Sequence, residues 1–368
     1  MDLTTCAVVI PSNRAVLAHR LTAIPDSVPV YIVEDGDVLA QCERPNTQTF
    51  SKDFQRRYMG SDYDLIPRGT AACRNFGFYY LWRETEYQRI LSIDDDVSTR
   101  AGFLDAYTCL GEVRPVESVR SGDWINTIAL FDEAPPCFAR GFPFESRIPS
   151  AHSTTVTQAR VVAHMGLWDG VLDTHAVDKQ LFPEYQRTYV DLTVTRDAVD
   201  VTASGGRARY PLSSMNFGFV REALPAMYQA PMRSSFLDRY ALWRYDDIWA
   251  GYLFQTLASI RGDACTVGAP IVRHEKAGNL QRELGGEHYG ILLSPYFYGV
   301  VDHAARDLRP DAYVSMYAAL MDRILTSQPE WAREHRVPRA YSTFIADLAS
   351  TMLRWAELCA RDRANSAA

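Results

Sequence analysis

The chain has 368 residues, of which 47% are hydrophobic and 23% charged, a composition typical of folded globular proteins that excludes extensive disorder. The formal net charge of −7 disfavours a nucleic-acid partner, and the sequence contains no run of eighteen apolar residues that would span a membrane. Its seven cysteines are scattered without C-x-x-C spacing, which predicts a reducing, cytoplasmic location and no structural zinc site.

The first hundred residues predict an α/β fold with an open, mostly parallel sheet flanked by helices. Short apolar runs at 6–12, 30–33 and 89–93 are typical of buried parallel strands. Between the second and third runs, residues 69–83 have aromatic and apolar side chains at helical spacing. Strand, helix and strand in this order are the start of a doubly wound sheet.

Candidate ligand-binding segments stand at or after the ends of the three predicted strands: Pro11-Ser12, Asp35-Gly36-Asp37 and Asp94-Asp95-Asp96. Open α/β sheets bind their ligands at the carboxyl ends of the strands. We therefore expect these segments to meet at one edge of the sheet and to bind a ligand there.

The rest of the chain divides into an irregular region and a helical end. Residues 123–210 predict only short strands and loops. Four later segments are predicted as helices or as a strand plus a helix: 217–228, 249–260, 313–325 and 343–361. The simplest organisation is one domain over 1–305 with a helical extension over 306–368, which packs on the sheet or forms a contact in a homo-oligomer.

The Asp94-Asp95-Asp96 triplet is the strongest local signal for chemistry. Side chains alternate along an extended segment, so Asp94 and Asp96 lie on one side and Asp95 points towards protein or ribose. Carboxylate oxygens suit Mg²⁺ or Mn²⁺, which keep coordination positions open for phosphate oxygens. The alternative is a solvated acidic loop without a metal.

A second acidic pair, Asp246-Asp247, stands beside Arg244 and two aromatic residues. Either carboxylate could cap the helix that follows. An acid in an aromatic pocket could instead have a raised pKa and accept a proton from a sugar hydroxyl. We expect one of the two to cap and the other to be catalytic.

His274 follows an apolar run and precedes Lys276 and Asn279. A single histidine is usually structural, but its place at a strand end makes it a candidate third metal ligand beside Asp94 and Asp96. Lys276 and Asn279 are candidate contacts to the phosphates.

Arg68, Arg74, Arg140 and Arg147 are candidate clamps for a diphosphate, because a guanidinium binds phosphate oxygens through two parallel hydrogen bonds. Surface solvation is the alternative for each of them.

Trp168 and Asn216 are candidates for the sugar pocket. An aromatic face suits a sugar ring, although Trp168 could equally belong to the core. Asn216 stands inside an apolar run, and a buried amide must hydrogen-bond either to backbone or to a ligand hydroxyl. The sequence lacks the P-loop, G-x-G-x-x-G and G-x-S-x-G motifs, which removes the common ATPase, dinucleotide and hydrolase interpretations.

Taken together, the motifs of this chain resemble those of the reversibly glycosylated polypeptides, the UDP-arabinopyranose mutase family, which has a GT-A-like glycosyltransferase fold. Nine blocks carry the resemblance: 9–12 (VIPS), 33–37 (VEDGD), 72–78 (ACRNFGF), 93–96 (IDDD), 139–144 (ARGFPF), 166–168 (GLW), 215–217 (MNF), 244–251 (RYDDIWAG) and 274–279 (HEKAGN).

The resemblance implies an enzyme that interconverts the pyranose and furanose forms of a nucleotide-bound sugar with the help of Mn²⁺ or Mg²⁺. The substrate would be UDP-arabinose or a GDP-hexose such as GDP-L-galactose. A metal on Asp94 and Asp96 would stabilise the leaving diphosphate, and Asp246 or Asp247 would move the hydroxyl proton.

The family also carries a reversible glycosylation on an arginine, and Arg147 occupies the matching position. A guanidinium stays protonated and is a poor nucleophile, so Arg147 could instead act as a phosphate clamp. The next residues, Ile148-Pro149, depart from the acidic-glycine pair usual in the family.

Two other functions remain open from the sequence. One is a retaining glycosyltransferase that binds the metal and diphosphate in the same way and transfers the sugar to an external acceptor. The other is a non-catalytic subunit that only binds a nucleotide-sugar.

Overall fold

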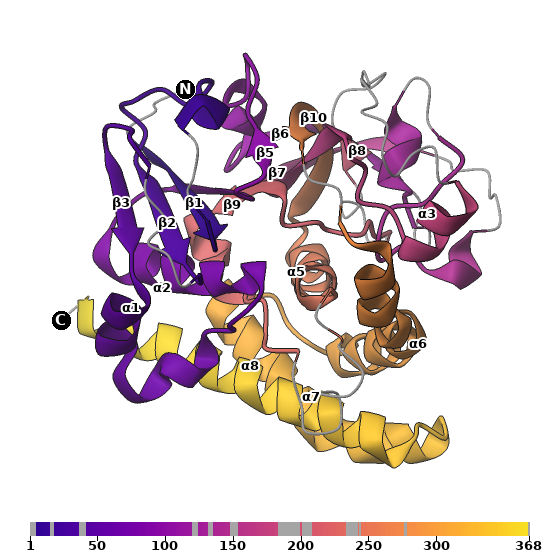
Figure 1. The fold of residues 1–368 in the computed structure, drawn as a ribbon. Coiled ribbons are helices and arrows are strands. Elements are labelled where there is room, and N and C mark those ends of the chain that lie inside the picture. Colours follow the sequence, from indigo (N-terminus) through magenta and orange to yellow (C-terminus); the bar gives the residue numbers. More distant parts are fainter. Residues whose placement is uncertain are drawn as a thin grey trace.

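The structure is a computed structural model. It describes residues 5–14, 18–36, 42–119, 124–131, 135–147, 154–182, 199–200, 208–232, 242, 244–275 and 278–366. Figure 1 shows a curled sheet that crosses the molecule, with the longest helices gathered below it in this view.

Four N-terminal strands form a parallel unit in the order β3-β2-β1-β4. Their bounds are Cys6–Ser12 (β1), Val30–Glu34 (β2), Thr47–Phe50 (β3) and Arg89–Ile93 (β4). Every residue of β1 and β2 is buried, as expected for parallel strands covered on both faces. The predicted strands β1, β2 and β4 are confirmed, whereas the Thr-Gln-Thr-Phe sequence of β3 is too short and polar to predict a strand.

Six further strands continue the sheet to give the order β3-β2-β1-β4-β9-β7-β6-β8-β10-β5. They are Val97–Ser98 (β5), Val113–Val119 (β6), Thr154–Gly170 (β7), Val199–Asp200 (β8), Asn216–Val220 (β9) and Ala264–His274 (β10). The 17 residues of β7 correct the expectation of only short strands between 123 and 210. β9 pairs antiparallel with β4 and β7, and β10 pairs in parallel with β7. The α/β class and the GT-A-like architecture are confirmed.

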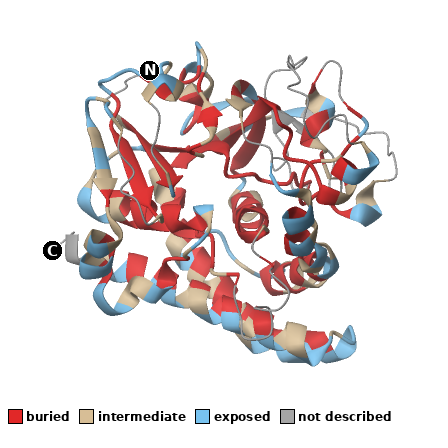
Figure 2. Ribbon diagram, in the orientation of Figure 1, coloured by how far each residue is buried: buried red, intermediate tan, exposed pale blue. Residues whose placement is uncertain are grey.

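Helix α5 (Asp246–Arg261) is the central helix of the fold, and Figure 2 shows it buried on its visible sides. Its first thirteen residues are all buried, because apolar side chains surround it instead of forming one stripe. The predicted segment 249–260 lies within it. The predicted helix 69–83 is present as a 3₁₀ turn, Ala71–Arg74, followed by α2 (Asn75–Glu84).

The remaining helices are shorter or were harder to predict. The α-helices are Lys52–Met59 (α1), Ala176–Leu181 (α3) and Leu280–Ala305 (α6), and the other 3₁₀ helices are Ala18–Leu21, Gly60–Leu65, Asp105–Cys109, Thr127–Leu130, Phe144–Ser146 and Arg221–Ala226. α6 contains Pro295 and several glycines, residues that usually interrupt helices, which is why its sequence does not predict 26 helical residues.

Two long helices, α7 (Tyr313–Glu334) and α8 (Arg339–Ser366), end the chain and confirm the predicted helical region. α8 packs on the body of the fold: the indole of Trp355 stacks on Tyr228 at 4.5 Å and donates a hydrogen bond to the Pro225 carbonyl at 3.0 Å. Trp82 of α2 donates to the Cys359 carbonyl at 2.9 Å. None of the helices in the described part of the chain is long and apolar enough to cross a membrane.

We expect Trp355→Ala to lower the free energy of unfolding by about 3–5 kcal/mol, because it leaves a cavity between α8 and the body of the fold. Thermal and urea denaturation followed by circular dichroism would measure the loss. Glu357→Ala, on the exposed side of the same helix, is the control and should change stability by less than about 0.5 kcal/mol. Equal effects of the two variants would contradict this account of α8.

Candidate functional site

A cavity of about 620 Å³ lies at the carboxyl ends of β1, β2 and β4, and α5 and α6 contribute to its walls. Its volume is in the range of small-molecule sites. The structure brings eleven of the residues singled out in the sequence into its lining: Pro11, Ser12, Asp35, Asp94, Asp95, Asp96, Arg140, Asp246, Asp247, His274 and Asn279.

The aspartate triplet occupies the turn between β4 and β5, and each of its carboxylates has a cationic partner. Asp94 is paired with the guanidinium of Arg74. Asp95 accepts a hydrogen bond from Ser12 Oγ at 2.8 Å and is paired with Arg14, whose Nη2 also lies 3.0 Å from Asp96 Oδ2. Burial, opposed by Arg74 and reinforced by the neighbouring aspartates, raises the pKa of Asp94 to about 6.

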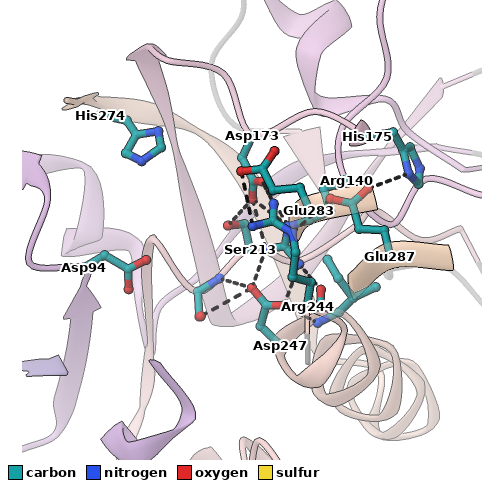
Figure 3. Close-up of polar contacts among 12 residues, drawn as sticks. Asp94, Arg140, Asp173, His175, Ser213, Arg244, Asp247, His274, Glu283 and Glu287 are labelled. Carbon is teal, nitrogen blue, oxygen red and sulfur yellow. Dashed lines mark hydrogen bonds and ion pairs between the residues drawn. The ribbon is translucent and has the colours of Figure 1, made fainter. Parts of the chain in front are cut away.

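His274 ends β10 and lines the cavity, on the same side as Asp94 in the view of Figure 3. Its Nδ1 lies 2.5 Å from the Val171 carbonyl, which can only accept, so Nδ1 carries the hydrogen. Nε2 is therefore the free ring nitrogen when the imidazole is neutral, and it lies 3.8 Å from Asp96 Oδ1.

The three predicted metal ligands, Asp94, Asp96 and His274, all line the cavity. Among the residues that the structure describes, no three His, Cys, Asp or Glu side chains lie close enough to hold a metal ion. Asp94 Oδ1 is paired with buried Arg74, whereas Asp96 directs Oδ1 towards His274 and Oδ2 towards Arg14. Asp96 and His274 fit Mn²⁺ or Mg²⁺ only as part of an open site that water and phosphate oxygens complete.

The opposite wall is centred on Arg140, which lines the cavity but is held by two carboxylates (Figure 3). Its Nε lies 2.9 Å from Asp173, and its two Nη atoms lie 3.0 and 2.9 Å from the two oxygens of Asp247. Gly141 allows this close approach: its φ is 87°, and a Cβ there would come within 2.7 Å of Ile248. Arg140 is therefore a structural centre of the site, with its guanidinium already occupied.

The network extends from Asp173 to α6 through Arg244, and Lys179, Glu283 and Glu287, which the sequence did not single out, complete it. Arg244 lies 3.2 Å from Asp173 and 2.9 Å from Glu287 of α6. Lys179 of α3 lies 2.9 Å from Glu283. Burial alone would raise the pKa of Asp173, but Arg140 and Arg244 outweigh it and hold that pKa well below its usual range. No motif signals these contacts, because they join segments more than thirty residues apart.

Asp246 and Asp247 begin α5 and have different environments. Asp247 binds Arg140 and accepts backbone hydrogen bonds from Ser214 at 3.1 Å and Ile248 at 2.9 Å. Asp246 lines the cavity and forms no salt bridge with any residue in the described ranges. Burial and the charge of Asp247 raise the pKa of Asp246 to about 7. Asp246 can therefore exchange a proton near neutral pH, whereas Asp247 is a structural anion.

Three residues predicted for the site belong instead to the core. Arg74 is fully buried and donates to Ser92 Oγ at 2.6 Å and the Ser214 carbonyl at 2.7 Å, so it positions Asp94 and does not clamp phosphate. Asn216 donates to the carbonyls of Leu167 and Pro270 at 3.0 and 3.1 Å and is fully buried. Trp168 is 2% exposed within β7 and does not line the cavity.

Arg147 also lies outside the cavity lining. It forms two hydrogen bonds with Asp178, at 2.7 and 3.1 Å, and its guanidinium stacks 3.8 Å from the Phe144 ring centroid. Since Asp178 belongs to α3, Arg147 anchors that helix, and the geometry does not support a phosphate clamp.

Of the other predicted nucleotide contacts, Arg68 and Gly36 lie next to the cavity without lining it. Arg68 lies 3.5 Å from Asp35 and so supports a carboxylate that does line it. Asp37 and Lys276 lie outside the described residues.

The curled sheet and the acidic cavity at its carboxyl edge define the chain as a GT-A-like α/β protein. The profile of the reversibly glycosylated polypeptides matches residues 5–346, and the chain belongs to that family.

Several plant proteins are similar to this chain. "UDP-arabinopyranose mutase 1" of Oryza sativa subsp. japonica is 24% identical over 337 residues, which cover 89% of this chain and 82% of the plant protein. "UDP-arabinopyranose mutase 1" of Arabidopsis thaliana is 28% identical over 277 residues, 72% of this chain and 71% of its own length. "Probable UDP-arabinopyranose mutase 4" of the same plant is 25% identical over 309 residues, 81% of this chain and 78% of its own.

We expect Asp246→Asn to make the protein more stable at pH 8, on the order of 2–4 kcal/mol in the free energy of unfolding. Because of the raised pKa, the folded protein still holds a proton between about pH 4 and pH 7 that the unfolded chain has already released. The native protein therefore loses stability as the pH rises through that window, and the neutral amide does not.

Urea denaturation of both proteins at pH 5, 6.5 and 8 would measure this difference, which should shrink as the pH falls. Asp322→Asn, at an exposed position on α7, is the control and should not change the pH dependence. A gain that stays constant with pH would show that ionisation of Asp246 is not its cause.

Proposed function

We propose that this chain is a nucleotide-sugar mutase that interconverts the pyranose and furanose forms of a sugar carried on a nucleoside diphosphate. The observation that carries the proposal is the position of Asp246, a carboxyl with a pKa of about 7 in the same cavity as the aspartate triplet. Family membership and the names of the plant relatives support the same reaction. UDP-arabinose is the first substrate to test, and a GDP-hexose such as GDP-L-galactose is the second.

The reaction needs one group that both accepts and donates a proton. When a pyranose becomes a furanose, the bond between C1 and the diphosphate breaks, and O4 loses its proton and closes on C1. The returning diphosphate then attacks C1 and displaces O5, which takes up a proton and becomes a hydroxyl. The net change moves one proton from O4 to O5. Asp246 can accept the proton from O4 and donate it to O5, because the pKa of Asp246 is close to neutral.

Asp247 and Arg140 keep the pKa of Asp246 close to neutral. Asp247 is held as an anion by Arg140 and by two backbone N–H groups, and its charge adds to burial in raising the pKa of Asp246. Arg140 in turn is held by Asp173. The proton-exchanging group therefore has a fixed position and an adjacent permanent negative charge.

The charge of the cavity supports a role for a divalent cation. Among its described lining residues, eight carry carboxylates and five are arginine or lysine, so a diphosphate would add negative charge to a site with a carboxylate excess. Asp96 and His274 would hold Mn²⁺ or Mg²⁺ together with the diphosphate, and the bound ion would stabilise charge on the leaving diphosphate. Ser12 and Arg14 keep Asp95 oriented beside this position.

The test is incubation of the purified protein with Mn²⁺ and single UDP- or GDP-sugars, followed by chromatography and mass measurement of the products. We expect a new isomer of unchanged mass without any acceptor. Sugar transfer that occurs only with an added acceptor would identify a retaining glycosyltransferase and overturn the mutase proposal. Binding without turnover of any sugar would favour a non-catalytic subunit.

Asp246→Asn should lower kcat by roughly 10²–10⁴-fold, because an amide cannot carry the proton between O4 and O5. Steady-state kinetics of the native protein from pH 5 to 9 should also show a change in kcat near pH 7, where Asp246 titrates. Since the variant is expected to be more stable, loss of activity could not be attributed to unfolding. Retention of most of the native kcat would contradict this role.

Asp96→Asn should lower metal-dependent turnover by roughly 10²-fold or more and weaken Mn²⁺ binding measured by calorimetry in the presence of UDP. Chelation with EDTA should stop the native reaction, and added Mn²⁺ should restore it. Asp105→Asn, an exposed aspartate on the Asp105–Cys109 turn, is the matched control. Full activity of Asp96→Asn after chelation would exclude the proposed metal.

A further inference from the structure

Arg14, two residues after the 9–12 block, contacts the two carboxylates that follow Asp94. Its Nη2 lies 3.0 Å from Asp96 Oδ2 and is also paired with Asp95. The Arg14 side chain is 36% exposed and lines the cavity. It lies two residues after Ser12, the last residue of β1, so the end of the strand positions it at the site.

The contact places Arg14 in competition with a metal. Asp96 presents Oδ1 to His274 Nε2 at 3.8 Å and Oδ2 to Arg14 at 3.0 Å. A divalent ion held between Asp96 and His274 would repel a guanidinium on the same carboxylate, and repulsion between cations is strong at such separations in a partly buried site. With the ion bound, the contact between Arg14 and Asp96 would be broken or weakened.

Arg14 differs in exposure and in partners from Arg74 and Arg140. Arg74 and Arg140 are buried and each bind fixed partners, including backbone carbonyls. Arg14 is partly exposed, and its guanidinium binds the two triplet carboxylates. A guanidinium matches a diphosphate as well as it matches carboxylates, so a diphosphate in the cavity offers Arg14 an equivalent partner.

We propose that Arg14 is an exchangeable counter-ion that neutralises Asp95 and Asp96 before ligands bind and transfers to the diphosphate when metal and nucleotide enter. The inference rests on the metal position proposed above. When Arg14 binds the diphosphate, Asp96 becomes available to the metal, and when the metal binds Asp96, Arg14 becomes available to the diphosphate. By linkage, each ligand therefore raises the affinity of the protein for the other through Arg14.

Isothermal titration calorimetry of Mn²⁺ and of UDP, each alone and with the other saturating, tests the exchange in the full chain. For the native protein we expect UDP to tighten Mn²⁺ binding. For Arg14→Gln we expect Mn²⁺ alone to bind roughly five- to tenfold more tightly than to the native protein, UDP to bind roughly tenfold more weakly, and UDP to tighten Mn²⁺ less. Arg14→Lys keeps the charge but not the paired hydrogen bonds and should fall between the two.

Arg282→Gln removes one positive charge from the same cavity without removing a contact to the triplet, and it is the matched control. Its Mn²⁺ affinity without UDP should match that of the native protein. An equal gain in Mn²⁺ affinity in Arg282→Gln and Arg14→Gln would show that the effect comes from the net charge of the cavity, and it would overturn the inference. Unchanged Mn²⁺ binding in a folded Arg14→Gln variant, verified by circular dichroism, would overturn it as well.

These outcomes are separate from failure of the proposed function. Absence of Mn²⁺ binding to the native protein, with or without UDP, would overturn the proposed metal site and the exchange together. Mn²⁺ binding and mutase turnover in the native protein, with unchanged binding in Arg14→Gln, would overturn the exchange alone.

Discussion

The site depends on one buried guanidinium, that of Arg140, which joins Asp173 to Asp247. A buried arginine is tolerated only where its donors are satisfied, and removing one partner of such a group leaves an uncompensated charge. Here the guanidinium and its two carboxylate partners come from three separated stretches of chain: the Arg140-Gly141 turn, the segment after β7 and the first turn of α5. The same contacts that neutralise Arg140 therefore also fix where α5 begins, and with it where Asp246 enters the cavity.

The adjacent carboxyl groups of Asp246 and Asp247 have different roles because the charged groups next to them differ. Asp247 and Asp173 are permanently paired with arginine, so they behave as fixed charges. Asp246 has a negative neighbour in place of a positive one, which favours its protonated form. Such a separation of two adjacent carboxyl groups by environment is a recurrent way to obtain a proton-exchanging acid near neutral pH.

Arg74 connects the triplet to the α5 side of the cavity. It binds Asp94 and the carbonyl of Ser214, and the N–H of the same Ser214 binds Asp247. The turn after β4 and the start of α5 are thus held in register through a single serine of the segment before β9. Mutations within this chain of contacts would disturb both acidic groups, so their effects would not be additive.

Local patterns in the sequence determined the parallel strands, the helix after residue 75, the C-terminal helices and the acidic turns, because burial and side-chain spacing are properties of consecutive residues. They also placed Asp246-Asp247 at a helix start. They did not distinguish Asp246 from Asp247, and they assigned Arg74, Arg147 and Asn216 to a ligand, although the first binds Asp94, the second Asp178 and the third backbone carbonyls. Only the tertiary structure decided these roles, because the partner of a charged or amide group lies far away in sequence and its distance sets both the pKa and the freedom of that group to bind a ligand.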